Sequence, residues 1–110
     1  MKLPEKEKAD IPHAKLTNYL LSEMHPVGKS KAKLFKVMGF NDNNVDLLKQ
    51  GLIDIAMSEE VVDIISSEHG VKYIVDGFLK TPSRSSIKLR TIWIIDKGHV
   101  HPRFVTAYPL

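Results

Sequence analysis

The sequence predicts an α+β fold in which three N-terminal helices pack on one face of a four-stranded antiparallel meander sheet. Apolar residues recur with helical spacing up to Ser58 and with alternating spacing after it. The second half is rich in Val, Ile, Tyr and Trp, and turn signals divide it into four runs. Helices followed by strands are typical of an α+β domain. One face of the sheet is therefore expected to be open.

Length and composition favour one small domain. The chain has 110 residues, 43% of them apolar, and a net charge of +3, which permits an anionic partner without requiring one. Residues 1–10 are rich in charge and predict a flexible arm, so the domain is expected over residues 11–110. No apolar run approaches the ~18 residues of a membrane span. There is no secretory signal and no cysteine, which fits a cytoplasmic protein with no membrane partner and excludes thiol catalysis.

The helical half contains three segments with one apolar stripe each. Gly39 suits the end of the second segment, and the Asn-rich residues 41–44 offer caps for the third. The three helices are predicted at residues 12–22, 29–38 and 45–57. The stripes predict a core containing Leu16, Leu20, Leu34, Phe35, Leu48 and Leu52.

The strand half contains alternating runs with polar residues at mid-length. In the third run, Lys88 and Arg90 fall on the face opposite Trp93, and in the fourth run Phe104, Thr106 and Tyr108 fall together. A sheet with one solvated face has alternating apolar and polar residues, and this alternation explains any one of these residues. Several cations and hydroxyls together favour a site. The four strands are predicted at residues 60–66, 71–79, 87–96 and 102–108.

The stretch HPVGKSKAKLF, residues 25–35, contains a Gly-Lys-Ser. A nucleotide-binding phosphate loop would need a glycine where the chain has Glu23, and a strand where the preceding segment is helical. This context argues against a phosphate loop. His25 precedes a proline, which is a common turn position, and it could also face a site formed by the same stretch.

Lys31 stands out on the predicted second helix. Helical residues advance by about 100°, so Lys31 falls about 200° from Lys29, inside the apolar arc that contains Leu34, whereas Lys33 shares the solvated face. The stem of Lys31 could run along apolar surface to water. Alternatively, its ammonium crosses to polar strand residues and binds a substrate phosphate.

Metal and cofactor motifs are missing from the sequence. Carboxylates do not pair, and the histidines show no ligand spacing beyond His99-x-His101, which lies in a predicted turn. We expect neither a metal nor a cofactor.

Six segments in a fixed order carry a resemblance to a known family. They are IPHAKLTNYLL, HPVGKSKAKLF, MGF, GVKYIVDGFLKTP, LRTIWIID and PRFVTAYP. Their order over residues 11–109 resembles a bacterial family of small domains without an assigned function. More distantly, helices followed by four strands are similar in layout to the ribonuclease toxin superfamily that includes barnase, RelE and colicin D. Members of the family are encoded beside a small antitoxin-like protein, which favours a toxin. The chain lacks the strand glutamate of barnase-like members.

The resemblance implies metal-independent RNA cleavage. A base takes the proton of a ribose 2′-hydroxyl, the oxygen attacks the adjacent phosphate, and an acid protonates the leaving 5′-oxygen. RNA is then required for its 2′-hydroxyl. The candidate residues are His25 as acid or base, Lys31, Lys72 and Arg90 as phosphate-binding cations, and Thr91, Thr106 and Tyr108 as orienting groups.

A non-enzymatic binding module is the alternative: an immunity protein, antitoxin or adaptor that uses the open sheet face or an edge strand. Tyr73, Trp93 and Tyr108 could anchor such an interface. The expected partners are RNA for the enzyme, and a small antitoxin or immunity protein for the toxin. Buried cations would favour the enzyme, whereas a flat apolar patch ringed by charge would favour the module.

Overall fold

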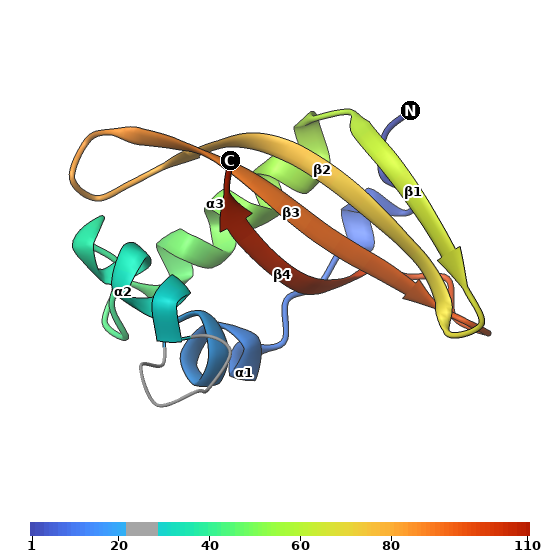
Figure 1. Cartoon of the computed structure of the whole chain (residues 1–110), viewed down its shortest axis with the longest axis horizontal. Helices are drawn as coiled ribbons and strands as arrows, with labels where there is room; N and C mark the ends of the chain where they lie inside the picture. Colours follow the sequence, from blue (N-terminus) through green and yellow to red (C-terminus); the bar gives the residue numbers. More distant parts are fainter. Residues whose placement is uncertain (22–28) are drawn as a thin grey trace.

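The computed structural model describes residues 1–21 and 29–110, and it leaves the side chains at positions 18, 19 and 29–31 outside that description. The helical elements are η1 (Lys6–Lys8), α1 (His13–Lys15), the π-helical turn η2 (Leu16–Leu20), α2 (Lys29–Val37) and α3 (Val45–Ser58). The strands are β1 (Val61–Ser67), β2 (Gly70–Lys80), β3 (Ser86–Asp96) and β4 (Arg103–Pro109) (Figure 1). They form one antiparallel sheet in the order β1-β2-β3-β4, so the α+β class and the meander are confirmed.

The first predicted helix is built from two kinds of turn. After α1, the amide of Leu21 donates to the carbonyl oxygen of Leu16 at 2.8 Å, which is the wider spacing of a π turn. The extra residue brings Leu16, Leu20 and Leu21 into the core together. In a regular helix the same three positions would spread over about 140° of the circumference.

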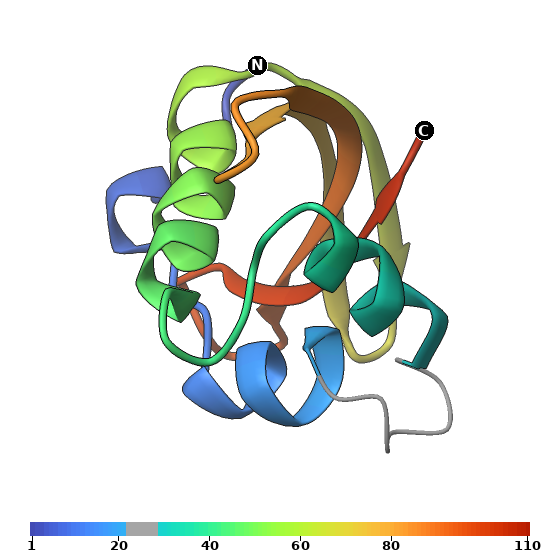
Figure 2. The same ribbon diagram turned by 90° about the vertical axis from the view of Figure 1, so that its left-hand side faces the viewer.

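The helix α3 covers the sheet from behind in the view of Figure 1, and Figure 2 shows it along one side of the strands. It packs on β2 and β3, where glycines allow close approach: a Cβ at Gly77 would lie 2.9 Å from Cγ2 of Ile55. The shorter helices are arranged differently, because α1 contacts β4 and α2 packs chiefly on η2. Of the predicted core, Leu34 is half-buried and Leu16, Leu20, Phe35, Leu48 and Leu52 are fully buried.

Residues 1–10, for which the charge predicted a flexible arm, contribute one residue to the core and contact the start of β1. Leu3 is only 2% exposed within the core, so one apolar residue anchors a polar segment. The amide of Val61 donates to the carbonyl oxygen of Met1 at 2.7 Å, and the terminal amino group lies 2.8 Å from the Glu60 carboxylate. The N-terminus therefore covers the start of the edge strand β1.

A β-bulge in β4 corrects the predicted face of that strand. Ile92 pairs with Thr106, but the next residue, Trp93, pairs with Phe104, so β4 has one extra residue here. As a result Phe104 points into the core, and Thr106 and Tyr108 line the opposite face. Strict alternation had placed the side chains of Phe104, Thr106 and Tyr108 on one face of the strand.

Trp93 lies at the centre of the core. Its ring meets that of Phe104 edge to face, with centroids 5.4 Å apart and planes at 73°. The indole N–H donates to Oγ1 of Thr91 at 2.9 Å, and the Thr91 hydroxyl donates to the carbonyl oxygen of Val75 at 2.6 Å. Thr91 is fully buried, so the structure gives it this structural role rather than contact with a ligand at the surface.

We therefore predict that Thr91→Val lowers the free energy of unfolding by about 1–3 kcal/mol, because the buried indole N–H of Trp93 loses its acceptor. Urea unfolding followed by tryptophan fluorescence measures the change. Thr91→Ser keeps the hydroxyl and serves as the matched control. A Thr91→Val protein of unchanged stability would contradict the structural role.

Candidate functional site

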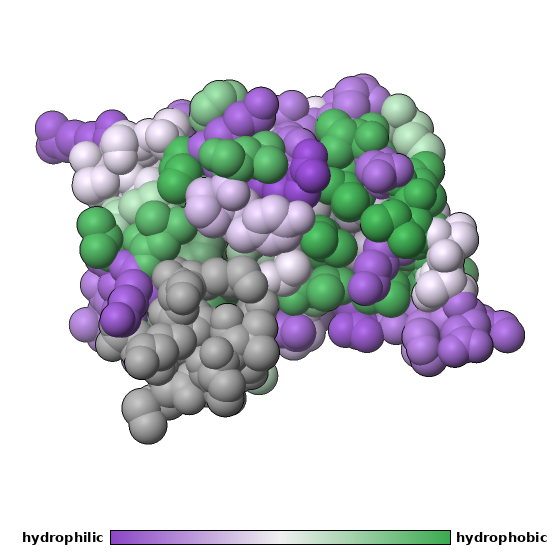
Figure 3. Space-filling model, viewed as in Figure 1, coloured by the Kyte–Doolittle hydropathy of each residue, from purple (hydrophilic) through white to green (hydrophobic). Residues whose placement is uncertain are grey.

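The face of the sheet that α3 leaves open carries most of the predicted site residues. Cross-strand pairing places Asp76 of β2, Arg90 of β3 and Tyr108 of β4 in one row. We call these three residues the arginine row. Figure 3 shows this face, where hydrophobic surface is interrupted by hydrophilic side chains. Asp76 and Arg90 lie within the two longest strands and Tyr108 lies near the end of β4, so the paired sheet positions the row.

Asp76 holds the Arg90 guanidinium through two parallel hydrogen bonds. Nε donates to Oδ1 at 2.9 Å and Nη2 donates to Oδ2 at 3.0 Å, with side-chain exposures of 34% for Arg90 and 15% for Asp76. These hydrogen bonds raise the pKa of Arg90, as does the adjacent Tyr108 hydroxyl, while desolvation acts in the opposite direction. The bidentate pair fixes the orientation of the guanidinium. The result is a permanently charged, half-buried cation beside a hydroxyl.

Lys72 lies on the same face but not in the row. It is four residues from Asp76 on β2, which corresponds to roughly 13 Å along a strand. Thr106, half-buried on β4, is paired with Ile92 between the two positions. Lys72 and Arg90 therefore occupy separate positions along the same face, although the sequence grouped them together.

Lys72 instead lines a concavity of ≈ 480 Å³ at the end of the sheet, which we call the basic hollow. Asp96 and Arg103 pair across it, with Nε to Oδ2 at 2.6 Å and Nη2 to Oδ1 at 3.0 Å. The Arg103 hydrogen bonds lower the pKa of Asp96, and those of Asp96 raise the pKa of Arg103. The hollow is lined chiefly by Lys15, His69, Lys72, Ile94, Asp96 and Arg103.

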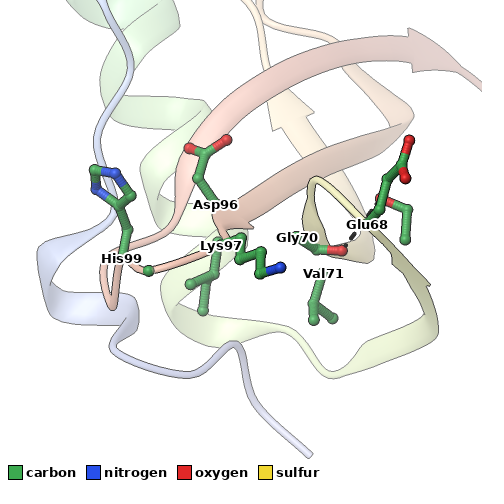
Figure 4. Close-up of a pocket in the computed structure, with 9 residues that line it drawn as sticks. Glu68, Gly70, Val71, Asp96, Lys97 and His99 are labelled. Carbon is green, nitrogen blue, oxygen red and sulfur yellow. Dashed lines mark hydrogen bonds between the residues drawn. The ribbon is translucent and has the colours of Figure 1, made fainter.

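A second concavity of ≈ 370 Å³ lies at the β1–β2 and β3–β4 turns. It shares Ser67 and Asp96 with the basic hollow. Figure 4 shows Glu68, Gly70 and Val71 on one side of it and Lys97 and His99 on the other. Its charges are mixed, so it offers no single-sign site. Within residues 1–21 and 29–110, no three His, Asp or Glu side chains gather as metal ligands.

The structure thus brings Arg90 and Tyr108 together, places Thr106 and Lys72 further along the open face, and puts Thr91 in the core. His25 lies outside the described residues, and so does the side chain of Lys31, so their proposed roles and the expected reach of Lys31 to the strands stay predictions.

Sequence reasoning gave no role to Asp76, Lys15, His69 or Arg103. The pairing of Asp76 with Arg90 could have been predicted from the sequence, because a hairpin whose loop is residues 81–85 places the two residues opposite each other. Lys15, His69 and Arg103 come together only in the tertiary structure, and no local sequence pattern predicts that they do.

Comparison with known proteins defines the family. The family model described as "Domain of unknown function (DUF6883)" matches residues 2–110. The chain belongs to this family. The resemblance to a family of small domains without an assigned function is therefore confirmed. The match begins at residue 2, so it includes nearly all of the N-terminal segment of this DUF6883 domain.

A chain with the same fold occurs in the "Contact-dependent growth inhibition toxin - immunity protein complex from Klebsiella pneumoniae 342". The TM-score is 0.75 over 96% of both chains, at 19% sequence identity, so the likeness concerns the fold alone. No curated protein matches the DUF6883 chain. Among its described helices, none is long and apolar enough to cross a membrane.

Proposed function

We propose that this DUF6883 domain is a metal-independent endoribonuclease that acts as the toxin of a bacterial toxin–antitoxin or related system. The arginine row carries the proposal. A cation held in a fixed orientation, half-removed from water and beside a hydroxyl, suits the stabilisation of charge that develops on a phosphate. The bidentate carboxylate of Asp76 holds the guanidinium in one orientation.

The proposed reaction is an internal transfer at phosphorus. A base removes the proton of the 2′-hydroxyl, the 2′-oxygen bonds to phosphorus, the bond from phosphorus to the 5′-oxygen breaks, and an acid protonates that oxygen. The products carry a 2′,3′-cyclic phosphate and a 5′-hydroxyl. Arg90 stabilises the phosphorane, and Tyr108 and Thr106 orient the strand. His25 is the proposed acid or base on sequence grounds.

The fold supports a role in a toxin–immunity system. It does not distinguish the toxin from the immunity protein, because the similar chain comes from a complex of the two. One observation favours the binding module as the second candidate. The edge strand β1 exposes apolar side chains on both faces, with Val62, Ile64 and Ile65 each 44–54% exposed. Such an edge accepts a strand from a partner. The partner strand would come from an antitoxin or immunity protein if this domain is the toxin, and from the toxin if this domain is the immunity protein or antitoxin.

The experiment that tests the proposed function is cleavage of a cellular RNA pool by the purified domain, with and without a chelator. We expect RNA to be cut equally in both conditions and single-stranded DNA of matched sequence to be spared, because DNA lacks the 2′-hydroxyl. Loss of cleavage on chelation would contradict the metal-independent mechanism. No cleavage of any RNA, with no inhibitor bound, would favour the binding module.

Two lysines of α2 provide a paired prediction. We expect Lys31→Ala to reduce the cleavage rate by ~100- to 1,000-fold, the cost of one preorganised cation, because the helical pattern places Lys31 within the apolar arc of α2 and not on its solvated face. Lys33 is exposed, so Lys33→Ala should mainly weaken binding in a salt-dependent way. Single-turnover cleavage at two salt concentrations measures both. Equal, small effects would mean that α2 contributes only a charged surface.

A further inference from the structure

The basic hollow has an unbalanced set of charged groups. Asp96 is the carboxylate among its lining residues, and Arg103 already holds both of its oxygens. Lys72 makes no ion pair with any residue in the described ranges. Lys15 and His69 line the same space, and the His69 imidazole lies 3.6 Å from the Glu68 carboxylate. The hollow therefore presents the positive charge of Lys72, with which no carboxylate in its wall pairs.

The size of the hollow and its apolar lining suit one nucleotide of a nucleic acid strand. Its volume of ≈ 480 Å³ is that of a small-ligand site. Ile94, which is buried, and Val105 supply apolar surface beneath the cations. Charges above an apolar floor interact more strongly than charges in free solvent, because the local dielectric is lower. A phosphate with an adjoining sugar and base matches this combination.

The position of the hollow relative to the arginine row decides what kind of ligand can use both. Lys72 and the row lie on the same open face, separated by roughly 13 Å along β2. That separation of the two backbone positions suits two phosphates of a single strand. Thr106 and Ile92 lie between them and present a half-buried, mixed surface.

We propose that the basic hollow is a second phosphate subsite, which binds an RNA strand at a phosphodiester away from the one cleaved at Arg90. The inference rests on the proposed function for its choice of RNA. It reassigns Lys72 from the scissile phosphate to substrate binding. An RNA must then extend past the cut to reach the hollow, so short substrates lose the contribution of Lys72.

Binding of an uncleavable strand tests the subsite separately from catalysis. The probe is a fluorescent DNA oligonucleotide, which has the same phosphates but no 2′-hydroxyl, and its affinity is measured by anisotropy over a range of salt concentrations. Lys72→Gln is compared with Lys8→Gln, an exposed lysine on η1, which packs on α3 away from the open face. Both variants remove one positive charge at an exposed position, so both are expected to fold, as circular dichroism checks.

We expect Lys72→Gln to reduce the slope of log affinity against log salt by about 0.7, the value for one lost phosphate contact on a single strand, and Lys8→Gln to leave it unchanged. Cleavage of a long RNA should show a raised KM in Lys72→Gln, and the ratio of KM between variant and wild type should fall as the RNA is shortened. Equal slopes in the two variants, or no binding of the probe by the wild-type protein, would overturn the subsite. A protein that binds the probe with the expected slopes but cuts no RNA would overturn the proposed function and support the subsite.

Discussion

Arg90→Gln is expected to lower the rate of RNA cleavage by ~100- to 1,000-fold, the usual cost of removing one preorganised group that stabilises developing charge. The structure explains why this arginine should matter more than its neighbours. Asp76 holds the guanidinium at two nitrogens, and Tyr108 lies beside it, so the cation needs no reorganisation when the phosphorane forms. Single-turnover cleavage of an oligoribonucleotide measures the loss.

Two controls separate chemistry from charge and from stability. Lys88→Gln removes an exposed cation of the same face and strand, and it should cost only salt-sensitive binding. Arg90→Lys keeps the charge but loses the bidentate geometry, so we expect an intermediate rate. Removal of Arg90 leaves the Asp76 carboxylate, 15% exposed, without its partner, so urea unfolding must show that each variant is folded under assay conditions. Equal rates for Arg90→Gln and Lys88→Gln would contradict the role of the arginine row.

Trp93→Ala is expected to lower the free energy of unfolding by about 3–5 kcal/mol. The indole is fully buried, meets Phe104 edge to face and donates a hydrogen bond to Thr91, so truncation leaves a cavity and removes both contacts. Since a domain of this size has only about 5–15 kcal/mol of stability, most of it could be lost. Urea unfolding followed by circular dichroism measures the change.

Phe78→Ala is the matched control, because Phe78 is an aromatic residue on the neighbouring strand that is 66% exposed. We expect its effect to stay within about 0.5 kcal/mol. A Trp93→Ala protein as stable as the Phe78→Ala protein would mean that the core does not depend on the indole.

The sequence predicted the regular parts of the fold because the regular parts are local. Alternation around Arg90 sets the two faces of β3, and short turn signals set the order of the strands. The bulge in β4 was missed, because an extra residue in a strand depends on its partner strand. The anchoring of residues 1–10 was missed as well, because Leu3 is a single apolar residue among charges and only the finished core shows where it docks.

The candidate site was predictable in part for a similar reason. Alternation placed Arg90 on the face opposite Trp93, but its partner Asp76 was given no role, although the hairpin register sets the two residues opposite each other. Composition could not show that Thr91 turns inward to bond Trp93, since a threonine suits either face of a strand. The basic hollow could not be predicted at all, because Lys15 and Arg103 come from distant parts of the chain and meet only in three dimensions.

The chemistry at the new 3′ ends of cleaved RNA tests the central claim most directly. An oligoribonucleotide is incubated with the purified domain in the presence of a chelator, and mass spectrometry identifies the fragments. The proposed mechanism predicts a 2′,3′-cyclic phosphate on one fragment and a 5′-hydroxyl on the other, and no product from a strand whose 2′-hydroxyls are methylated. Fragments with a 3′-hydroxyl and a 5′-phosphate would contradict it, because attack by water would then have replaced attack by the 2′-oxygen.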